Sequence, residues 1–346
     1  MYQKNNGEVH TAKALMRERV RRVFALLDEV LEAPLVHSNH RELLQIRLRE
    51  GREQAEAWPE ISAVQVPLLV HSAVAGDERP ALPVAAACTL LYLGADLLDS
   101  VIDHELPPPW RIYDSAEVIL TATTLLGALP QLAIARLQEQ GTPPVRLWAL
   151  AHLFADTVLT MNAGQHEDLL FSNLENVSLE DSRAMVERKS GSPSALLARA
   201  GAILATEDPF TIQAYTAFGS CYGIAKQLIN DVGGIWGEGA SQDLLNGRRT
   251  FPIVHALSTL RGKQRERLQN LLALARESAE HHDEVRTVLA AAGSVRYTAL
   301  IVWVYQRQAR NHLAAASPQG TARRELRMLL DRASLVPQPI PHHPPS

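Results

Sequence analysis

Three aspartates in one short stretch have the types and spacing that most clearly suggest chemistry. Asp96, Asp99 and Asp103 are separated by three and four residues. On a helix that turns about 100° per residue, these offsets place the three carboxylates within roughly 60° of one another. Between positions 80 and 110 there is no Lys or Arg, so the neighbouring sequence offers no salt-bridge partner. Buried carboxylates are costly without a partner, and Mg²⁺ shared with a substrate phosphate is one partner they can hold. The alternative is a solvated acidic stripe on an amphipathic helix.

A second polar group of residues lies in the helix predicted over 209–238. Gln227, Asn230, Gly234 and Glu238 share one face of that helix by the same spacing argument. Two adjacent glycines in a helix interior each cost roughly 1 kcal/mol relative to Ala. Either a bulky group packs close to the backbone there, or the helix ends nearby. Three further polar segments lie between or after these helices: Gly164-Gln165-His166-Glu167-Asp168-Leu169, Glu187-Arg188-Lys189-Ser190-Gly191 and Ser241 to Pro252.

The elements that must position these residues are predicted to be helices throughout. No run alternates as a strand does, and we find no internal repeat or linker. We predict one all-α domain over 11–335, a bundle of roughly ten or more helices, between a disordered N-terminus (1–10) and a proline-rich tail (336–346). The helical patterns cover 11–33, 39–56, 60–74, 81–105, 114–139, 144–173, 178–206, 209–238, 250–260, 264–281, 283–315 and 320–334.

Composition and charge exclude several classes of protein. The 34 basic and 38 acidic residues give a net charge of −4 without a long basic run, so nucleic-acid binding is not expected. Cys88 and Cys221 lie in apolar surroundings, as reduced core residues of a cytosolic protein do. The N-terminus has no signal-peptide core, and the longest apolar run, Ala81–Ala95, is too short to span a bilayer. We therefore expect a cytoplasmic protein with no stable membrane insertion.

Taken in order, these motifs resemble those of the trans-isoprenyl diphosphate synthases, the polyprenyl synthetase family, which has the class I isoprenoid (terpenoid) synthase fold. The resemblance covers about residues 60–260. The family's DDxxD motif corresponds to Asp99-Ser100-Val101-Ile102-Asp103, its GQxxDL motif to Gly164–Leu169, and its KTG motif to Lys189-Ser190-Gly191. Its QxxDDxxD motif corresponds to Gln227–Gly234, which Ile235-Trp236-Gly237 follows. Its S-D-L...R-T-x-P segment corresponds to Asp243-Leu244 through Arg248, Arg249, Thr250 and Pro252.

The resemblance implies Mg²⁺-dependent prenyl transfer in isoprenoid biosynthesis. An allylic diphosphate would ionise to pyrophosphate and an allylic cation, and about three Mg²⁺ ions would neutralise the leaving group. By resemblance, Asp99 and Asp103 would ligate two ions, Asn230 would ligate a further one, and Lys189 would bind the diphosphate. Lys189 could instead be a solvated helix residue. The resemblance adds Gln227, Arg248, Arg249 and Arg111 as diphosphate contacts, and Asp96, Asp168, Asp231 and Glu238 as further metal or supporting residues; for Gln227 and Asp168 the alternative is polar capping inside the bundle.

The chain also departs from the family pattern at several positions. Ser100 replaces the second aspartate of the first motif, and Asn230 and Gly234 replace the first and last aspartates of the second. The GKRxRP motif, which holds isopentenyl diphosphate in the family, should lie in the stretch Trp58–Pro67, which contains no basic residue. Of the arginine pair that usually follows the first motif, only Arg111 is left. The sequence therefore describes a divergent member that lacks the usual GKRxRP motif.

These departures leave two other functions open. The pattern Asn230-Asp231-x-x-Gly234-x-x-x-Glu238 resembles the metal motif of terpene cyclases, which ionise a single diphosphate. Cyclases usually steady carbocations with aromatic side chains, and this chain has only 5 Trp, 7 Tyr and 6 Phe. Prenyl transfer is therefore our first hypothesis, a terpene cyclase or diphosphate lyase the second, and a non-catalytic subunit of a heteromeric synthase the third.

The resemblance also bears on product length and assembly. Gly94 and Ala95 occupy the positions that form the floor of the family's tail pocket, five and four residues before Asp99. Two small residues there permit a prenyl tail of farnesyl length or longer. Alternatively, Gly94 merely allows close helix packing. By resemblance alone, we expect a homodimer that binds a prenyl diphosphate substrate.

Overall fold

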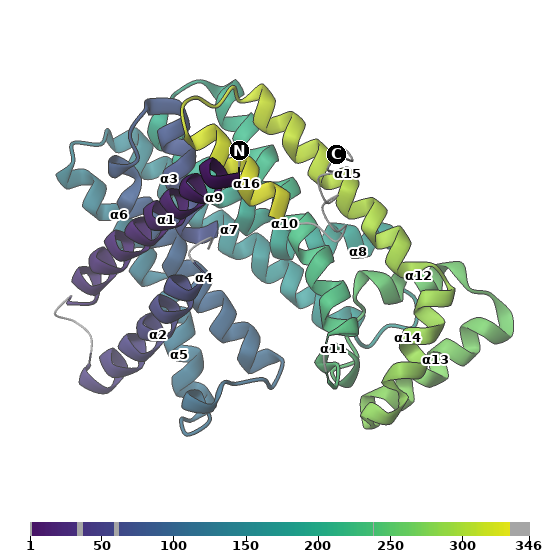
Figure 1. The fold of residues 1–346 in the computed structure, drawn as a ribbon. Coiled ribbons are helices and arrows are strands. Elements are labelled where there is room, and N and C mark those ends of the chain that lie inside the picture. Colours follow the sequence, from purple (N-terminus) through teal and green to yellow (C-terminus); the bar gives the residue numbers. More distant parts are fainter. Residues whose placement is uncertain (1, 33–36, 59–61, 238, 333–346) are drawn as a thin grey trace, which may run out of the picture. The chain divides into compact units, whose positions relative to one another are not determined.

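The computed structural model describes residues 2–32, 37–58, 62–237 and 239–332 (Figure 1). Within these ranges the regular elements are helices and there is no strand, which confirms the predicted all-α bundle of roughly ten or more helices. The proline-rich tail (336–346) lies outside the described residues. The helices are α1 (Tyr2–Leu31), α2 (Ser38–Ala57), α3 (Ser62–Ala75), α4 (Leu82–Ile102), α5 (Ser115–Leu126), α6 (Ala128–Glu139), α7 (Pro144–Phe171), α8 (Leu179–Val186), α9 (Ser192–Ala205), α10 (Pro209–Trp236), α11 (Gln242–Leu245), α12 (Phe251–Thr259), α13 (Gly262–Glu277), α14 (His282–Ala291), α15 (Ser294–Ala315) and α16 (Ala322–Arg332), with short turns η1 (Arg79–Ala81), η2 (Pro108–Trp110), η3 (Glu187–Gly191) and η4 (Ala279–His281).

Several helix boundaries differ from those predicted. Helix α1 begins at Tyr2 where a disordered segment 1–10 was predicted, because residues 2–10 contain no proline to stop the helical pattern. The predicted helix over 114–139 is divided at Gly127 into α5 and α6. The predicted helix over 283–315 is divided at Gly293, whose φ of +76° L-residues rarely adopt. Helix α11 was not predicted, because four residues are too few to show a helical period.

The chain divides into two compact units, which we describe separately. Unit 1 comprises Met1–Val158, Ser194–Thr216 and Leu313–Leu329, and unit 2 comprises Leu159–Pro193, Ala217–His312 and Leu330–Ser346. The boundaries fall inside helices such as α7, α10 and α15, and not in a flexible linker.

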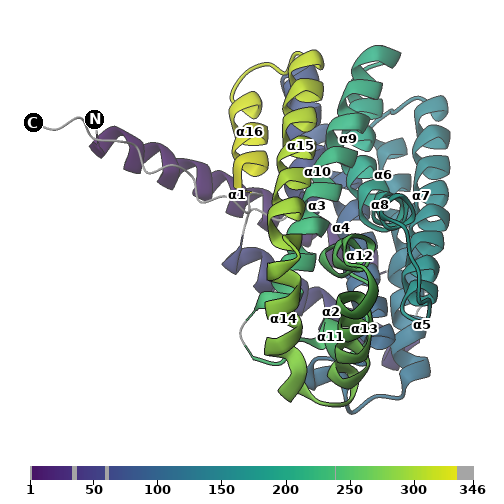
Figure 2. The same cartoon turned by 90° about the vertical axis from the view of Figure 1, so that its right-hand side faces the viewer.

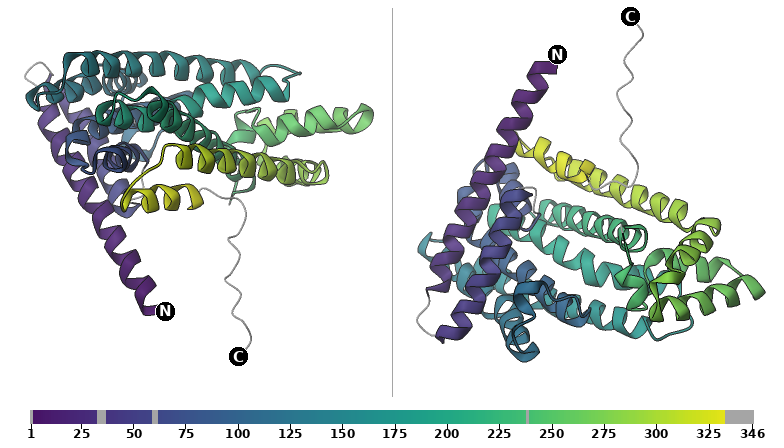
Figure 3. Two further views of the ribbon diagram at one scale, coloured as in Figure 1. Left: turned by 90° about the horizontal axis from the view of Figure 1, so that it is seen from above. Right: turned by 60° about the horizontal axis from the view of Figure 1, so that its bottom comes forward.

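Helix α4 is the central element of unit 1. Helices α1, α2, α3, α5 and α6 all pack against it (Figures 1 and 3, purple to blue). Val84 to Leu91 are fully buried or nearly so, which explains why the sequence of this helix is apolar on almost every side. The burial ends toward the C-terminal turns, where Asp96 is exposed and Asp99 is half-buried. Unit 1 thus buries most of α4 and leaves its acidic end accessible.

Two helical spans in the described part of the chain are long and apolar enough to cross a membrane: Arg79–Ile102 and Ser115–Glu139. A bent pair, Ala279–Ala291 with Ser294–Ala315, passes the same test when taken as one span. The first span has 24 residues and is longer than the apolar run Ala81–Ala95 on which the sequence argument relied, so that argument was wrong about length. The share of its apolar window that is buried inside the protein is 72%, so packing within the fold accounts for much of its apolar character.

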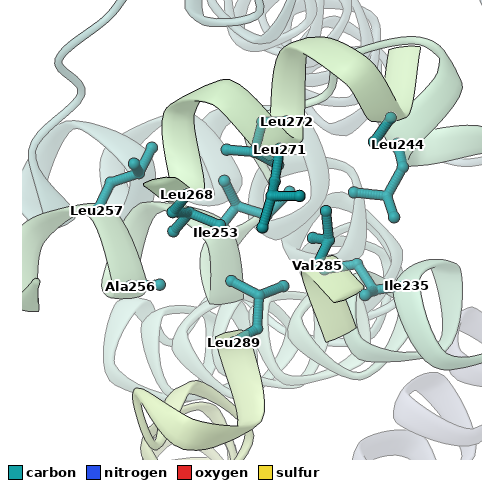
Figure 4. Close-up of a cluster of buried hydrophobic side chains, with 11 residues drawn as sticks. Ile235, Leu244, Ile253, Ala256, Leu257, Leu268, Leu271, Leu272, Val285 and Leu289 are labelled. Carbon is teal, nitrogen blue, oxygen red and sulfur yellow. The ribbon is translucent and has the colours of Figure 1, made fainter. Parts of the chain in front are cut away.

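Unit 2 is organised around two apolar clusters. One joins α10, α11, α12, α13 and α14, and its members lie side by side in Figure 4. The other joins α8, α10, α12 and α15. Figure 2 shows α11, α12 and α13 gathered together, in agreement with their contacts. The first cluster consists of Ile235, Leu244, Ile253, Ala256, Leu257, Leu268, Leu271, Leu272, Ala275, Val285 and Leu289, and the second of Met185, Val186, Ile224, Ala225, Leu228, Phe251 and Val302.

Candidate active site

The first aspartate-rich motif ends α4 in unit 1. The helix ends three residues earlier than predicted, with Asp103 as its C-terminal cap. The Asp103 backbone N–H donates to the carbonyl of Asp99, 2.8 Å away, so these two residues lie one turn apart. His104 then adopts a left-handed conformation, with a φ of +59°, and the Glu105 N–H donates to the Ser100 carbonyl at 2.9 Å. This is the hydrogen-bond pattern of a Schellman C-cap, with His in the place that Gly usually takes.

The last turn of α4 carries charge that favours a cation. The C-terminus of a helix bears a partial negative charge, and Asp99 and Asp103 add carboxylates to it. Partial burial, and then the nearby charge of Asp99, raise the pKa of Glu105. These groups fit a hard cation such as Mg²⁺. Among the described residues, no three or more His, Cys, Asp or Glu side chains gather to hold a metal.

Asp96 has a different partner. Its carboxylate lies 2.5 Å from the guanidinium of Arg47 on α2, whose side chain is buried and also donates to the Leu93 carbonyl at 3.1 Å. The sequence excluded only a local salt-bridge partner, and Arg47 lies 49 residues away along the chain. We assign Asp96 to the compensation of Arg47 and no longer expect it to ligate a metal.

The structure also places the other predicted residues of unit 1. Arg111 is exposed, and its Nε donates to the Leu106 carbonyl at 2.8 Å. A Cβ on Gly94 would lie 2.9 Å from both the carbonyl oxygen of Ala122 and the Cβ of Leu125 on α5. Gly94 therefore serves close helix packing, the alternative that the sequence left open. Ala95 is half-buried and stays the candidate for the pocket floor.

In unit 2, two cationic side chains converge on one carboxylate. Lys189 Nζ lies 2.7 Å from Asp168 Oδ2, and Arg248 Nη1 lies 3.4 Å from the same oxygen. The three side chains are 18%, 11% and 8% exposed, so solvent screens their charges only weakly. Lys189 is therefore not the solvated helix residue that the sequence allowed. Both cations are therefore held together in a weakly screened setting, in which a phosphate oxygen could also accept hydrogen bonds from them.

A π-turn and a glycine set the position of Lys189. The π-turn η3 separates α8 from α9, and Lys189 lies within it. A Cβ on Gly164 of α7 would collide with the backbone nitrogen of Lys189, so only Gly allows this approach. Arg188 and Glu167 join the same two elements through a bidentate salt bridge with N···O distances of 2.6 to 2.8 Å. Together these contacts bring Lys189 to Asp168.

Asp231 is a buried structural carboxylate. It accepts the Phe251 backbone N–H at 3.0 Å and the Gln227 Nε2 at 2.8 Å, and Gln227 Oε1 accepts the Ser190 hydroxyl at 2.7 Å. Burial raises the pKa of Asp231 to about 6; the two hydrogen bonds oppose that shift, and the charge of Asp168 adds to it. The network links α10 to η3 and α12. We therefore assign Asp231 and Gln227 to the support of η3, and Asp231 no longer to a metal.

The remaining residues of the second motif lie toward the end of α10. Asn230 is exposed, and Gly234 follows it one helical turn later on the same face. Glu238 lies outside the described residues. Helix α10 itself ends at Trp236.

Arg249 lies apart from the Lys189–Asp168 pair in its contacts. Together with Arg248 and Arg276 it lines a cavity of about 390 Å³ in unit 2. Burial, and then the charge of Arg276, lower the pKa of Arg249. The salt bridge to Asp168 comes from Arg248, and the sequence could not tell the two arginines apart.

The sequence reasoning gave no role to two polar residues beside these motifs. Glu105 adds a third carboxylate next to Asp99, and its position two residues after Asp103 was a usable signal. Gln165 Nε2 is buried, and no group among the described residues accepts a hydrogen bond from it. A buried amide without such an acceptor is a candidate ligand contact, and its place inside the GQxxDL match was the available signal.

Comparison with known proteins identifies the family. The polyprenyl synthetase family model matches residues 76–291, more than half of the chain. The chain is 30% identical over 205 residues to the geranylgeranyl diphosphate synthase of Mycobacterium tuberculosis (55% of this chain, 57% of the relative). It is 26% identical over 275 residues to the short chain isoprenyl diphosphate synthase of Methanothermobacter thermautotrophicus (76% and 82%). The match thus spans little more than half the length of the first relative.

Solved structures show the same fold. The geranylgeranyl pyrophosphate synthetase of Pyrococcus horikoshii superposes with a TM-score of 0.81 at 21% identity, over 95% of this chain and 100% of that one. The geranylgeranyl pyrophosphate synthase of Corynebacterium glutamicum, solved with isoprenyl diphosphate and magnesium, gives 0.72 at 18% identity, over 93% and 98%. The resemblance first noticed in the motifs is therefore confirmed, and the curated relatives are isoprenyl diphosphate synthases. This chain belongs to the polyprenyl synthetase family.

Proposed function

We propose that the protein is a Mg²⁺-dependent prenyltransferase that ionises an allylic prenyl diphosphate and joins it to isopentenyl diphosphate or another acceptor. The convergence of Lys189 and Arg248 on Asp168 carries this proposal. A bound diphosphate would neutralise part of the positive charge of Lys189 and Arg248, which now face Asp168. Cationic groups held in a weakly screened setting stabilise a leaving group as its charge develops, without reorganising.

The carboxylates Asp99 and Asp103 would hold Mg²⁺ at the last turn of α4, and Asn230 would hold a further ion. When bound, Mg²⁺ supplies Lewis-acid stabilisation of the pyrophosphate oxygens. The protein's own contribution is to hold hydrogen-bond donors in place before the reaction begins. Lys189 and Arg248 would donate to diphosphate oxygens, while Asp168 keeps both cations oriented.

The proposed reaction breaks the C1–O bond of the allylic substrate. The bonding electron pair leaves with pyrophosphate, and C1 becomes an allylic cation. In prenyl transfer, the double bond of the acceptor would donate its electrons to C1, and the new cation would then lose a proton to the released pyrophosphate. Ala95, half-buried in the turn before Asp99, is the residue we propose for the floor of the tail pocket.

One observation favours a second candidate function. The stretch where the family holds isopentenyl diphosphate is apolar here, and Ala63, Val64 and Val66 of α3 are buried in unit 1. No cationic group from this stretch can hold a second diphosphate. A terpene cyclase or diphosphate lyase needs only one diphosphate and is therefore the alternative; a non-catalytic subunit comes third.

Product analysis separates these functions. The protein with Mg²⁺ would be incubated with farnesyl or geranylgeranyl diphosphate, with and without isopentenyl diphosphate, and the products identified by mass spectrometry. A longer prenyl diphosphate formed only with isopentenyl diphosphate supports the transferase. A hydrocarbon or alcohol formed from the allylic substrate alone overturns it in favour of the cyclase or lyase. Absence of turnover, with pyrophosphate release measured in parallel, favours the subunit hypothesis.

We also propose a cytoplasmic homodimer. Both cysteines are buried and form no disulfide, as is usual in a reducing compartment. Unit 1 exposes apolar side chains on neighbouring helices, among them Leu120 of α5, Leu132 of α6 and Trp148 of α7, the last being 77% exposed. Apolar faces of this kind commonly pair subunits. A monomeric mass by sedimentation equilibrium at micromolar concentration would exclude the dimer.

A further inference from the structure

A second group of cationic side chains in unit 2 lines a cavity. The cavity has a volume of about 390 Å³, within the range of roughly 300 to 1,000 Å³ that small-molecule pockets have. Arg248 and Arg249 line it from the segment after α11, and Arg276 lines it from the last turn of α13. Because Arg248 already forms a salt bridge with Asp168, the charges that a ligand could neutralise are those of Arg249 and Arg276.

Arg249 carries a charge that no acidic group balances within the described ranges of the chain. Its Nε is buried, and no group in those ranges accepts a hydrogen bond from it. Burial, and then the charge of Arg276, lower the pKa of Arg249, and no carboxylate acts in the opposite direction. A buried cation without a counter-charge destabilises a folded protein. A bound anion would offset that cost.

The fold of unit 2 holds Arg276 close to the segment that carries Arg249. A Cβ on Gly247 would lie 2.5 Å from Arg276 Nε and 2.7 Å from its Cζ, and the φ of Gly247 is +67°, which L-residues rarely adopt. The Gly247 N–H donates to the Leu244 carbonyl at 3.1 Å, as in a helix C-cap. Leu244 of α11 and Leu272 of α13 are buried in the apolar cluster that Figure 4 shows. The two like charges are therefore kept together by packing.

We propose that this cavity is an anion site that binds a phosphate group between Arg249 and Arg276. The two guanidinium groups carry two positive charges, and a phosphate group carries nearly two negative charges around neutral pH. Guanidinium groups donate pairs of parallel hydrogen bonds to phosphate oxygens, and a phosphate has enough oxygens to accept from both arginines. The inference goes beyond the proposed function and does not depend on it, because it requires neither Mg²⁺ nor a prenyl diphosphate.

The rest of the lining fits a phosphate with or without an organic group attached. The side-chain amide of Gln269 can add a neutral donor, and Leu272 and Ala273 add apolar surface. Glu277 also lines the cavity and opposes an anion, but it is a single exposed carboxylate against two guanidinium groups. Inorganic phosphate and a phosphate carried on a small organic molecule are the two sources of this chemistry.

Phosphate binding to the metal-free protein tests the inference. Inorganic phosphate and adenosine monophosphate would each be titrated into the protein by calorimetry. Arg276→Gln should weaken phosphate binding by about tenfold or more, because it removes hydrogen bonds from a charged donor. Lys263→Gln removes the same charge from an exposed position of the same helix and should bind phosphate as the original protein does. Tighter binding of adenosine monophosphate would identify the organic source, and tighter binding of inorganic phosphate the free ion.

Two results would overturn the inference. One is an equal phosphate affinity in Arg276→Gln and in the original protein, and the other is an absence of binding at up to about 10 mM phosphate. Melting temperatures equal to that of the original protein, expected because both substituted side chains are exposed, show that the variants are folded. Either negative result leaves the proposed function intact, since these titrations contain no Mg²⁺ and no prenyl substrate. Phosphate binding without any prenyl turnover would overturn the proposed function alone.

Discussion

The two aspartate-rich segments of this protein use their acidic residues in opposite ways. At the end of α4, Asp99 and Asp103 are half-buried, and the helix stops beside them. On α10, the acidic residue of the motif, Asp231, is buried and accepts hydrogen bonds from Phe251 and Gln227. Similar motifs thus place accessible carboxylates, which we propose as metal ligands, at the end of one helix and a buried, hydrogen-bonded carboxylate inside another. Burial, and not residue type, separates the two roles.

The largest effect is expected at the end of α4. Asp99→Ala should lower kcat by about 10³-fold, because it removes a carboxylate proposed to hold the ion that stabilises the leaving group. The melting temperature should stay nearly unchanged, since Asp99 is only half-buried. Steady-state kinetics and thermal unfolding measure the two effects.

Asp96→Ala is the matched control, three residues away on the same helix. Because Asp96 forms a salt bridge with the buried Arg47, the Asp96→Ala variant should keep kcat within a few-fold of the original value and should have a lower melting temperature. Equal losses of activity in the two variants would break the distinction between Asp96 and Asp99.

Removal of Lys189 should cost about 10²-fold in kcat/KM, since it deletes one of two proposed diphosphate contacts. Arg248 remains beside Asp168 in that variant and keeps part of the function. Lys189→Ala should also weaken the binding of inorganic pyrophosphate, as measured by calorimetry. Pyrophosphate binding equal to that of the original protein would show that Lys189 only neutralises Asp168.

The buried carboxylate of α10 should make stability depend on pH. The pKa of Asp231 is about 6 in the folded protein, compared with 3.8 for an ordinary aspartate. The folded state therefore holds the extra proton between these values, and this group's contribution to stability falls as pH rises from about 4 to 6. The difference between the two pKa values corresponds to about 3 kcal/mol.

Asp231→Asn removes this titration, so the free energy of unfolding of the metal-free protein should fall less between pH 4.5 and pH 7 than in the original protein. Urea unfolding at both pH values makes the comparison. Parallel pH profiles for the two proteins would mean that burial does not raise the pKa of Asp231, and would contradict its assignment as a buried support of η3.

The smallest effect concerns the two small residues before Asp99. Ala95→Phe should shorten the product or exclude long allylic substrates, with little change in stability. Gly94→Ala should lower the melting temperature by several degrees without changing the product, because its Cβ would press on α5. Product analysis and calorimetry distinguish the two variants, and a product change in Gly94→Ala would return that residue to the pocket.

The sequence allowed us to predict residues whose motifs follow one another in a fixed order along the chain. It did not allow us to predict contacts between segments that are far apart in the sequence. Asp99, Asp103, Lys189 and Asp168 were proposed as site residues because their motifs follow one another as in the family, and these roles stay predictions. The pairing of Asp96 with Arg47 was missed because its partner lies on α2, far from it in sequence.

The other ambiguous predictions concern glycines, because a glycine in a sequence indicates that another group packs closely against the backbone but does not show which group it is. Gly94 was ambiguous between a pocket floor and helix packing, and α5 settles the packing. The carboxylate beside Gly234, that of Asp243, comes from α11, a helix too short to be recognised from its sequence.

The π-turn at Glu187–Gly191 has a consequence for how this chain could lose its function. Helices α8 and α9 adjoin it directly, so the chain stays helical through the turn. Deleting one residue would let an ordinary α-helix continue, but would rotate Lys189 by about 100° away from Asp168. The direction of the Lys189 side chain thus depends on the number of residues in the turn and not only on the identity of residue 189. A gene could retain every recognisable motif and still encode an inactive enzyme after a single in-frame codon deletion.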